Sequence, residues 1–217
     1  MSSDQLTPVL YTTLEGAGKD EFEERRSVFI GHATHIENEE EAMAFIKQIQ
    51  KEHADATHNV WAYRLSGGTS TEQAARYSDD GEPQGSSGLP TLEAIRKKGV
   101  FDAVVVTTRY FGGILLGVGG LIRAYSHAAS IALDAARIIT YEKYTEFLLE
   151  TTYSDYQIIL QELPRFGVLT DESEFTDRVT LTLAVKATRY AELCERLSEL
   201  TNGQVFLLES GTRFDYR

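Results

Sequence analysis

Two glycine-rich segments that lie close together constrain this chain more than any other feature. Residues 76–126 read RYSDDGEPQGSSGLPTLEAIRKKGVFDAVVVTTRYFGGILLGVGGLIRAYS, where the two segments flank a short predicted helix and one unbroken apolar strand. Glycine lacks a Cβ, so runs of it allow unusual turns and close approach of the backbone rather than a packed core. We therefore expect these two loops to form the functional site.

The predicted site combines carboxylates from the first loop with two arginines, two aromatic rings and five glycines from the second. A helix is predicted to start near Gly120, where free N–H groups and the positive end of the helix dipole favour an anion. Gly119 is expected to need a positive φ. The predicted binding residues are Asp79, Asp80, Glu82, Arg109, Tyr110, Phe111, Gly112, Gly113, Gly117, Gly119, Gly120 and Arg123.

Structural roles for the same residues compete with this interpretation. The glycines could let the second loop pack tightly under the first, and the two rings could divide between the core and the surface. The carboxylates could cap backbone N–H groups or pair with Arg76, Arg109 or Arg123, which would tie the two loops together. The residues are compatible with both interpretations.

Several familiar chemistries are not supported by the residues. No lysine follows the glycines as a P-loop requires, and the third glycine of a dinucleotide fingerprint is missing. The carboxylates lack the spacing of an EF-hand, no histidine has metal-ligand spacing with the single cysteine, Cys194, and no serine sits in a nucleophile elbow. We therefore predict no catalytic residue, no metal site and no cofactor.

Charge and hydropathy limit the partners. The net charge is −12, and it divides evenly, since residues 1–138 carry 13 basic and 19 acidic groups and residues 139–217 carry 8 and 14. A globally basic, nucleic-acid-binding surface is therefore excluded. No apolar run reaches the roughly 20 residues of a membrane span, and the first sixteen residues do not resemble a secretion signal, so a cytoplasmic protein without membrane contact is expected.

The pattern of elements predicts an α+β protein with two domains, residues 1–138 and 139–217. In the first, the Val104–Val106 run is typical of a strand buried on both faces. The elements predicted there are strands 22–36, 58–65 and 102–110, helices 37–53, 91–99 and 121–139, and a long loop at 66–89. In the second, strands and helices alternate as β-α-β-β-α-β, typical of a ferredoxin-like fold, with Ser154 as the N-cap of its first helix.

Three segments resemble the signature of the IMPACT family, in the order that the family has them: HADATHNVWAYR, RYSDDGEPQGSSGLP and VVVTTRYFGGILLGVGGLIRAYS. With FEERRSVFIGHA upstream, the resemblance covers about residues 15–138. Residues 139–217 resemble the small ferredoxin-like domain of bacterial members. Family members often have a basic residue where this chain has Val28, Leu89 and Leu115, a departure that weakens any nucleic-acid role.

The resemblance implies both a fold and a function. The first domain should be similar to the second domain of a small-subunit ribosomal protein and to domain IV of elongation factor G, and the second to domain V of that factor. Eukaryotic members bind a translational co-activator and restrain a stress-responsive kinase. The implied function is non-enzymatic regulation of translation through the ribosome, RNA or a translation-associated protein. The alternative is an enzyme for a small-molecule or phosphate ligand, using the loops at 78–90 and 109–123.

Overall fold

The computed structural model describes residues 10–216, which form two compact units, Tyr11–Thr140 and a second that begins at Tyr141. The chain passes from the first unit into the second within strand β7 (Ile138–Thr151). Both units combine helices with an antiparallel sheet, which confirms the predicted α+β class. Residues 1–9, on which the predicted location partly depends, lie outside the described residues.

The first unit is built on a five-stranded sheet in the order β2-β3-β6-β4-β5. Every neighbouring pair is antiparallel. The strands are β2 (Gly18–Glu24), β3 (Ser27–His35), β4 (His58–Leu65), β5 (Ala74–Ser78) and β6 (Ala103–Tyr110). The central strand β6 therefore has hydrogen-bonded neighbours on both sides, and the second glycine-rich loop, which follows it, leaves from the middle of the sheet.

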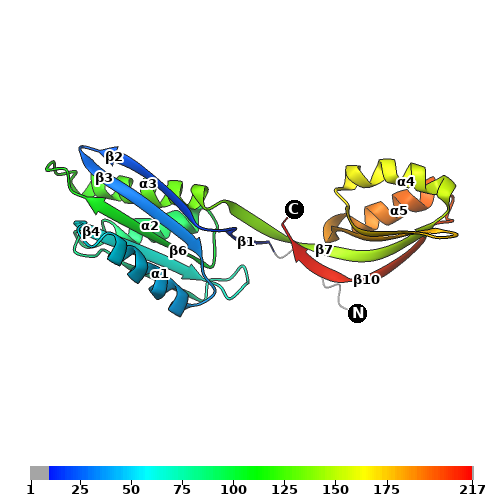
Figure 1. Cartoon of the computed structure of the whole chain (residues 1–217), viewed down its shortest axis with the longest axis horizontal. Coiled ribbons are helices and arrows are strands. Elements are labelled where there is room, and N and C mark those ends of the chain that lie inside the picture. The colour runs from blue at the N-terminus through cyan, green and yellow to red at the C-terminus, as the bar shows by residue number, and fades with distance from the viewer. Residues whose placement is uncertain (1–9, 217) are drawn as a thin grey trace. The chain divides into compact units, whose positions relative to one another are not determined.

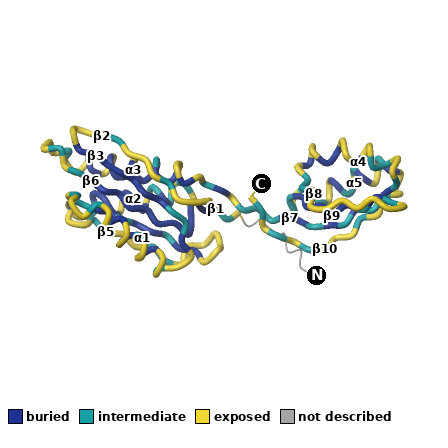
Figure 2. Tube along the Cα trace, viewed as in Figure 1, coloured by how far each residue is buried: buried dark blue, intermediate teal, exposed yellow. Residues whose placement is uncertain are grey.

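Helices cover both faces of this sheet (Figure 1). Helix α1 (Glu39–Glu52) packs on one face, where its apolar side chains meet Val104 and Val106. Helices α2 (Gly88–Lys97) and α3 (Val118–Ala135) pack on the other, where they meet Val105. Alternate valines of β6 thus enter two different cores, as the apolar run predicted, and the strand is buried along nearly its whole length (Figure 2).

Three predictions in this unit are wrong. The predicted strand 22–36 is a hairpin of β2 and β3, because Arg25 and Arg26 adopt positive φ values of 50° and 65° and turn the chain back. Two consecutive positive φ values suit a tight hairpin, but Asn-Gly rather than Arg-Arg is the usual sequence signal. The predicted loop 66–89 contains the edge strand β5, and the predicted helix 121–139 runs from Val118 to Ala135 instead.

The second unit has the predicted element order. Its elements are β7, α4 (Tyr153–Phe166), β8 (Leu169–Phe175), β9 (Val179–Lys186), α5 (Tyr190–Leu200) and β10 (Phe206–Asp215). The strands lie in the order β10-β7-β9-β8, and the short strand β1 (Tyr11–Leu14) also pairs with β7. All the pairs among β7 to β10 are antiparallel.

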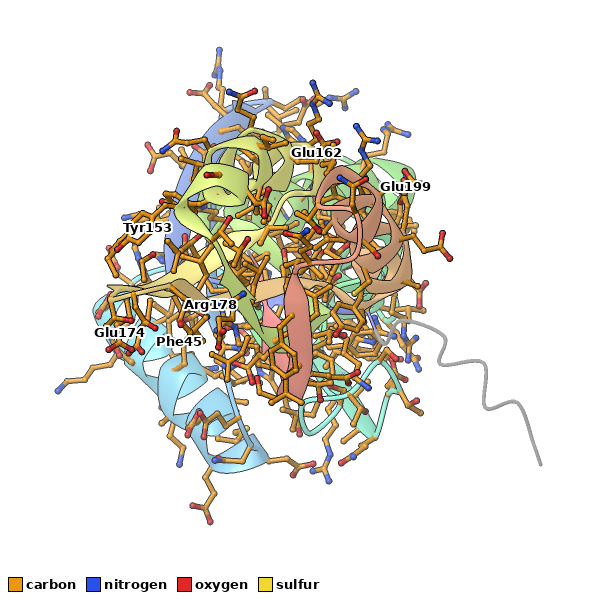
Figure 3. The ribbon with its side chains drawn as sticks, turned by 90° about the vertical axis from the view of Figure 1, so that its right-hand side faces the viewer. Phe45, Tyr153, Glu162, Glu174, Arg178 and Glu199 are labelled. Atoms are coloured by element: carbon orange, nitrogen blue, oxygen red, sulfur yellow. The ribbon has the colours of Figure 1, made fainter. Side chains whose placement is uncertain are left out.

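Both helices of the second unit pack on one face of its sheet. Ile159 and Leu163 of α4 and Leu193 of α5 join a buried apolar cluster with the strands. The two helices are also joined by a charged contact, in which the buried Glu162 of α4 accepts a hydrogen bond of 3.0 Å from Arg196 of α5 (Figure 3 labels Glu162). The N-cap of α4 is Thr152, not the predicted Ser154, because the Thr152 hydroxyl accepts from the Asp155 amide at 3.2 Å.

Candidate functional site

Asp79, the first carboxylate of the first loop, builds the loop itself. It accepts hydrogen bonds from the amides of Gly85 at 2.8 Å, Ser87 at 3.1 Å and Gly88 at 2.8 Å. Ser87 and Gly88 are the N-cap and the first residue of α2, and Gly85 lies in the loop just before them; the N-cap residue provides no side-chain capping bond of its own. Burial pushes the Asp79 pKa up, but the amide and Ser87 hydroxyl bonds outweigh it, so the pKa lies below its usual value.

Asp80 joins the same loop to strand β4. Its carboxylate accepts from the amide of Asn59 at 2.6 Å, and its carbonyl lies 2.7 Å from Nδ1 of His58. Asp80 also has a positive φ of 45°, a conformation that aspartate tolerates better than most residues. Both the carboxylate and the backbone carbonyl of Asp80 therefore already have polar partners within the protein.

Glu82 forms the tie between the two loops that the structural interpretation anticipated. Its Oε1 accepts from Nη1 of Arg109 at 2.6 Å and from the hydroxyl of Tyr125 at 2.8 Å. Glu82 is only 8% exposed and Arg109 only 4%. Burial, followed by the nearby Glu82 charge, raises the pKa of the Tyr125 hydroxyl. The charge of Arg109 is therefore neutralised inside the fold.

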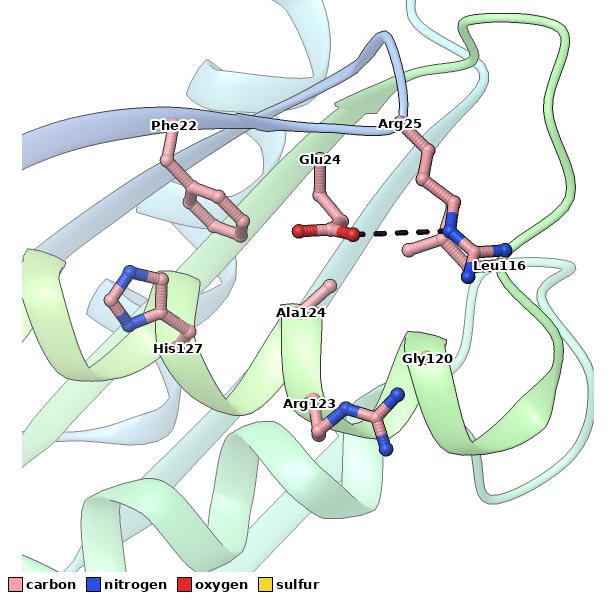
Figure 4. A pocket seen from close by; sticks show the side chains of 8 residues that line it. All are labelled: Phe22, Glu24, Arg25, Leu116, Gly120, Arg123, Ala124 and His127. Carbon is pink, nitrogen blue, oxygen red and sulfur yellow. Dashed lines mark ion pairs between the residues drawn. The ribbon is translucent and has the colours of Figure 1, made fainter.

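Arg123 lies away from that pair. Its side chain lines a different pocket, together with Arg25 and Glu24 from the turn between β2 and β3 (Figure 4). The expectation that Arg109 and Arg123 converge on one anion is therefore wrong. The reason is tertiary: Arg109, at the end of β6, turns into the core toward Glu82, whereas Arg123 projects from α3 beside the β2–β3 turn.

The five glycines of the second loop have different roles. Gly113 and Gly117 adopt positive φ values of 83° and 71°. A Cβ on Gly112 would lie 2.0 Å from the carbonyl of Arg26, so that glycine permits close backbone contact with the β2–β3 turn. Gly119 and Gly120 lie inside α3, which begins at Val118, and the positive φ expected at Gly119 is wrong.

The two aromatic residues after Arg109, Tyr110 and Phe111, lie in different environments. Tyr110 is half-buried, and its hydroxyl donates to Asp55 at 3.0 Å and lies 3.0 Å from Nδ1 of His53. Phe111 is 45% exposed, although its amide is held by the hydroxyl of Thr57 at 3.0 Å. The Tyr110 ring thus belongs to a local polar network, and the Phe111 ring is available at the surface.

A cavity of about 430 Å³ joins the two glycine-rich loops. Its polar wall holds Glu82, Arg109 and His58, with His58 Nε2 lying 3.9 Å from Glu82 Oε1. The apolar wall is formed by Pro83, Phe111, Leu115, Leu116, Val118 and Leu121. His58 was not among the predicted site residues, although it lies in the segment HADATHNVWAYR that resembles the family signature. Its place at the start of a predicted strand gave no further signal of a site.

Of the apolar side chains of the second loop, only Phe111 was predicted from the sequence as a binding residue, and the others were missed. Within residues 111–122, five large apolar side chains are exposed, and we call these five the apolar segment: Phe111 at 45%, Ile114 at 40%, Leu115 at 80%, Val118 at 57% and Ile122 at 39%. The available signal was the run Ile114–Leu116 between glycines, since such a run has no helix or strand face to bury it.

Two further features of the described residues bear on the site. None of the described helices is both long and apolar enough to cross a membrane. Among residues 10–216, no three side chains of His, Cys, Asp or Glu are grouped so that they could hold a metal ion.

Comparisons with known proteins match both parts of the chain. The family model of the Impact N-terminal domain matches residues 25–133, and the model of a domain of unknown function, DUF1949, matches residues 149–204. IMPACT family member YvyE of Bacillus subtilis (strain 168) is 36% identical over 194 residues, which is 89% of this chain and 88% of that protein. IMPACT family member YigZ of Escherichia coli (strain K12) is 33% identical over 184 residues, 85% and 90% of the two chains.

A solved structure agrees with these matches. The crystal structure of an hypothetical protein is 31% identical to this chain, with a TM-score of 0.58, and the match covers 92% of this chain and 97% of that one. Relatives more than 30% identical are thus matched over most of their length, and the two family models follow one another along the chain. The chain belongs to the IMPACT family, as a bacterial-type member in which an Impact N-terminal domain precedes a DUF1949 domain.

Proposed function

We propose that this IMPACT family member is a non-catalytic regulatory protein that acts on translation by docking a ribosomal or translation-associated protein through the apolar segment. The translational setting rests on the family resemblance. The choice of a protein surface as the partner rests on one observation, namely that a single short segment exposes five large apolar side chains. Exposed apolar groups gathered in one place mark interaction sites more often than scattered ones do.

The apolar segment is held in place by the rest of the unit. Gly112 packs against the backbone of Arg26, and the guanidinium of Arg25 donates to the carbonyl of Leu115 at 3.2 Å. The amide of Phe111 is fixed by Thr57. A preorganised surface loses less conformational entropy on binding, and this favours a docking role for such a loop.

The charges support a protein partner over nucleic acid. Arg109 is neutralised by Glu82, and the net charge of the chain is −12. Leu89 and Leu115 stand where family members often carry a basic residue, and both side chains are exposed, at 38% and 80%. Contacts with phosphate backbones need concentrated lysine and arginine, so we place ribosomal RNA second to a protein surface.

The fold supports the setting in translation. The second unit has the element order β-α-β-β-α-β and the strand order β10-β7-β9-β8, and we infer from these that it is ferredoxin-like. For the first unit we propose the resemblance to a ribosomal-protein domain and to domain IV of elongation factor G. We keep the domain boundary near residue 138, and we propose a cytoplasmic location.

Co-sedimentation with purified bacterial ribosomes, at low and at moderate salt, tests this function. We expect the intact chain to pellet with ribosomes at both salt concentrations, and Leu115→Ser and Val118→Ser to weaken that association. The controls are Ile158→Ser and Leu160→Ser on α4, where both side chains are also exposed, each at 46%. Absence of association at both salts, or equal weakening by the controls, would contradict the proposal.

A second candidate function is favoured by the cavity between the two loops. Its volume of about 430 Å³ lies in the range of ligand pockets, roughly 300–1,000 Å³. Because the carbonyl of Asp80 can only accept, Nδ1 of His58 carries the proton, and in the neutral ring Nε2 is an acceptor beside Glu82. A small molecule with an apolar body and a hydrogen-bond donor would fit this cavity. The second candidate function is therefore that of an enzyme acting on such a ligand.

Thermal-shift measurements with a panel of metabolites separate the two candidates. A ligand present at 100 times its Kd should stabilise the chain by about 2.7 kcal/mol. Under the cavity hypothesis, His58→Ala should abolish that shift, and Leu115→Ser should reduce it less. Under the docking hypothesis, no metabolite produces a shift that depends on His58, while ribosome association depends on Leu115.

A further inference from the structure

A second cavity, of about 260 Å³, lies between the β2–β3 turn and the first turns of α3 (Figure 4). It contains three nitrogen-bearing side chains, Arg25 from the turn and Arg123 and His127 from α3, with one carboxylate, Glu24. The ring of Phe22 closes one side, edge-on to His127 at 4.7 Å between ring centres. Neither the family comparisons nor the docking proposal assigns a role to this cavity.

Unpaired arginines concentrate at this corner of the molecule. Within residues 10–216, every arginine other than Arg26 and Arg123 has a carboxylate oxygen within 4.0 Å. Arg123 lines the cavity, and Arg26 follows Arg25 in the turn that borders it. The pairing of Arg25 with Glu24 is itself the longest of these, at 4.0 Å.

This distribution is unusual for an acidic chain. The protein has 33 acidic residues against 21 basic ones, so carboxylates are available to pair with almost any guanidinium. Among the described residues Arg123 has no carboxylate within 4.0 Å, and Glu24 reaches Arg25 only at 4.0 Å, so the positive charge at this cavity is incompletely compensated. An anion in the cavity would reduce the remaining repulsion between the two guanidinium groups. Guanidinium groups bind phosphate oxygens through two parallel hydrogen bonds, which a spherical anion cannot accept equally well.

We propose that this cavity binds the phosphate group of a small hydroxylated molecule, such as a sugar phosphate. Arg25 and Arg123 hold the phosphate oxygens, and the imidazole of His127 donates a further hydrogen bond. Glu24 accepts from a hydroxyl next to the phosphate and so selects an ester over inorganic phosphate. The cavity is small, and the carboxylates of β2 and the net charge of −12 oppose a long polyanion.

This inference does not rest on the docking function. Phosphate binding is a property of the purified chain alone, whereas docking needs the ribosome and the exposed side chain of Leu115. Failure of either experiment therefore leaves the other interpretable.

Backbone amide NMR of the full chain, titrated with ribose 5-phosphate and separately with inorganic phosphate, tests the proposal. We expect saturable shifts at the amides of Arg25, Gly120 and Arg123, with tighter binding of the sugar phosphate. Arg123→Gln should weaken binding about tenfold or more, the effect of one charge-assisted hydrogen bond. The matched control is Arg137→Gln, whose guanidinium pairs with Glu15 at 2.8 Å and should leave binding unchanged.

Three results would overturn the proposal. The first is absence of saturation by either ligand up to about 10 mM, where a Kd of 1 mM would give nearly full occupancy. The second is equal weakening by Arg123→Gln and Arg137→Gln. The third is that a ribo-oligonucleotide binds much more tightly than ribose 5-phosphate, with a salt dependence that indicates several phosphate contacts. That result would make the cavity part of a binding site for a polyanion. Thermal melts of both variants establish that each is folded.

Discussion

The two glycine-rich loops lie in the same unit and are built in opposite ways. In the first loop the carboxylates are used internally: Asp79 holds the start of α2, Asp80 holds β4, and Glu82 holds Arg109. In the second loop few side chains form polar bonds, and the apolar segment is exposed. The carboxylates of the first loop, which are prominent in the sequence, therefore stabilise the fold. The exposed residues of the apolar segment are the better candidates for a binding function.

The largest expected effect comes from removing the tie between the loops. Glu82→Ala leaves Arg109 buried without its counter-charge, and should lower the free energy of unfolding by about 3–5 kcal/mol, measured by urea denaturation. The control Glu93→Ala breaks an exposed pair with Arg96 and should cost less than about 1 kcal/mol. An equal decrease in the free energy of unfolding in the two variants would show that Glu82 does not hold the two loops together. Glu82 would then again be a candidate ligand-binding residue.

The second prediction concerns the backbone contact under the second loop. A Cβ at Gly112 would lie 2.0 Å from the carbonyl of Arg26, so Gly112→Ala must shift one of the two segments. We expect a loss of about 1–3 kcal/mol in thermal or urea unfolding.

Gly119→Ala is the matched control for Gly112→Ala. At Gly119 the nearest atom to an added Cβ is Nη1 of Arg123 at 3.7 Å, within a helix, where alanine is favoured over glycine by up to about 1 kcal/mol. A more stable Gly112→Ala variant would mean that the second loop is not held against the hairpin turn.

The third prediction concerns the contribution of the Asp79 carboxylate to the stability of the first loop. Asp79→Asn weakens bonds to three amides and should destabilise the chain by about 1–2 kcal/mol at neutral pH. Since the Asp79 pKa is lowered on folding, its contribution is complete above the ordinary value of 3.8 and is lost as the pH falls below it. The difference between wild type and variant should therefore shrink below about pH 4.

Urea unfolding across this pH range measures that difference. Asp177→Asn, at an exposed position bonded only to the adjacent Thr176, serves as the control and should change stability by less than about 0.5 kcal/mol. A constant difference between wild type and Asp79→Asn at every pH would show that ionisation of this carboxylate does not support the loop.

The smallest expected effect on stability is at the centre of the apolar segment. Leu115 is 80% exposed, so Leu115→Ser removes little buried surface and should change unfolding by less than about 0.5 kcal/mol. The same variant should bind ribosomes more weakly. A destabilisation comparable to that of Gly112→Ala would instead make Leu115 a structural residue and weaken the contrast between the loops.

Much of the fold was predictable because its signals are local. Strand β4 coincides with the predicted strand 58–65, and the burial of β6 on both faces follows from its valine run. The hairpin turn at Arg25 and Arg26 was missed, because its positive φ values are imposed by pairing with the rest of the sheet rather than by turn-forming residues. The first-loop carboxylates were correctly given a structural alternative, which the structure confirms.

The α+β class, the order of the elements and the family could all be predicted from the sequence, since hydrophobic periodicity, glycine positions and motif order are read along the chain. Which arginines lack a carboxylate partner depends instead on how the elements pack together. Arg109 meets Glu82 in the core, and Arg123 faces Arg25 across a cavity, because strand register and helix packing, not sequence separation, set which carboxylate reaches which guanidinium.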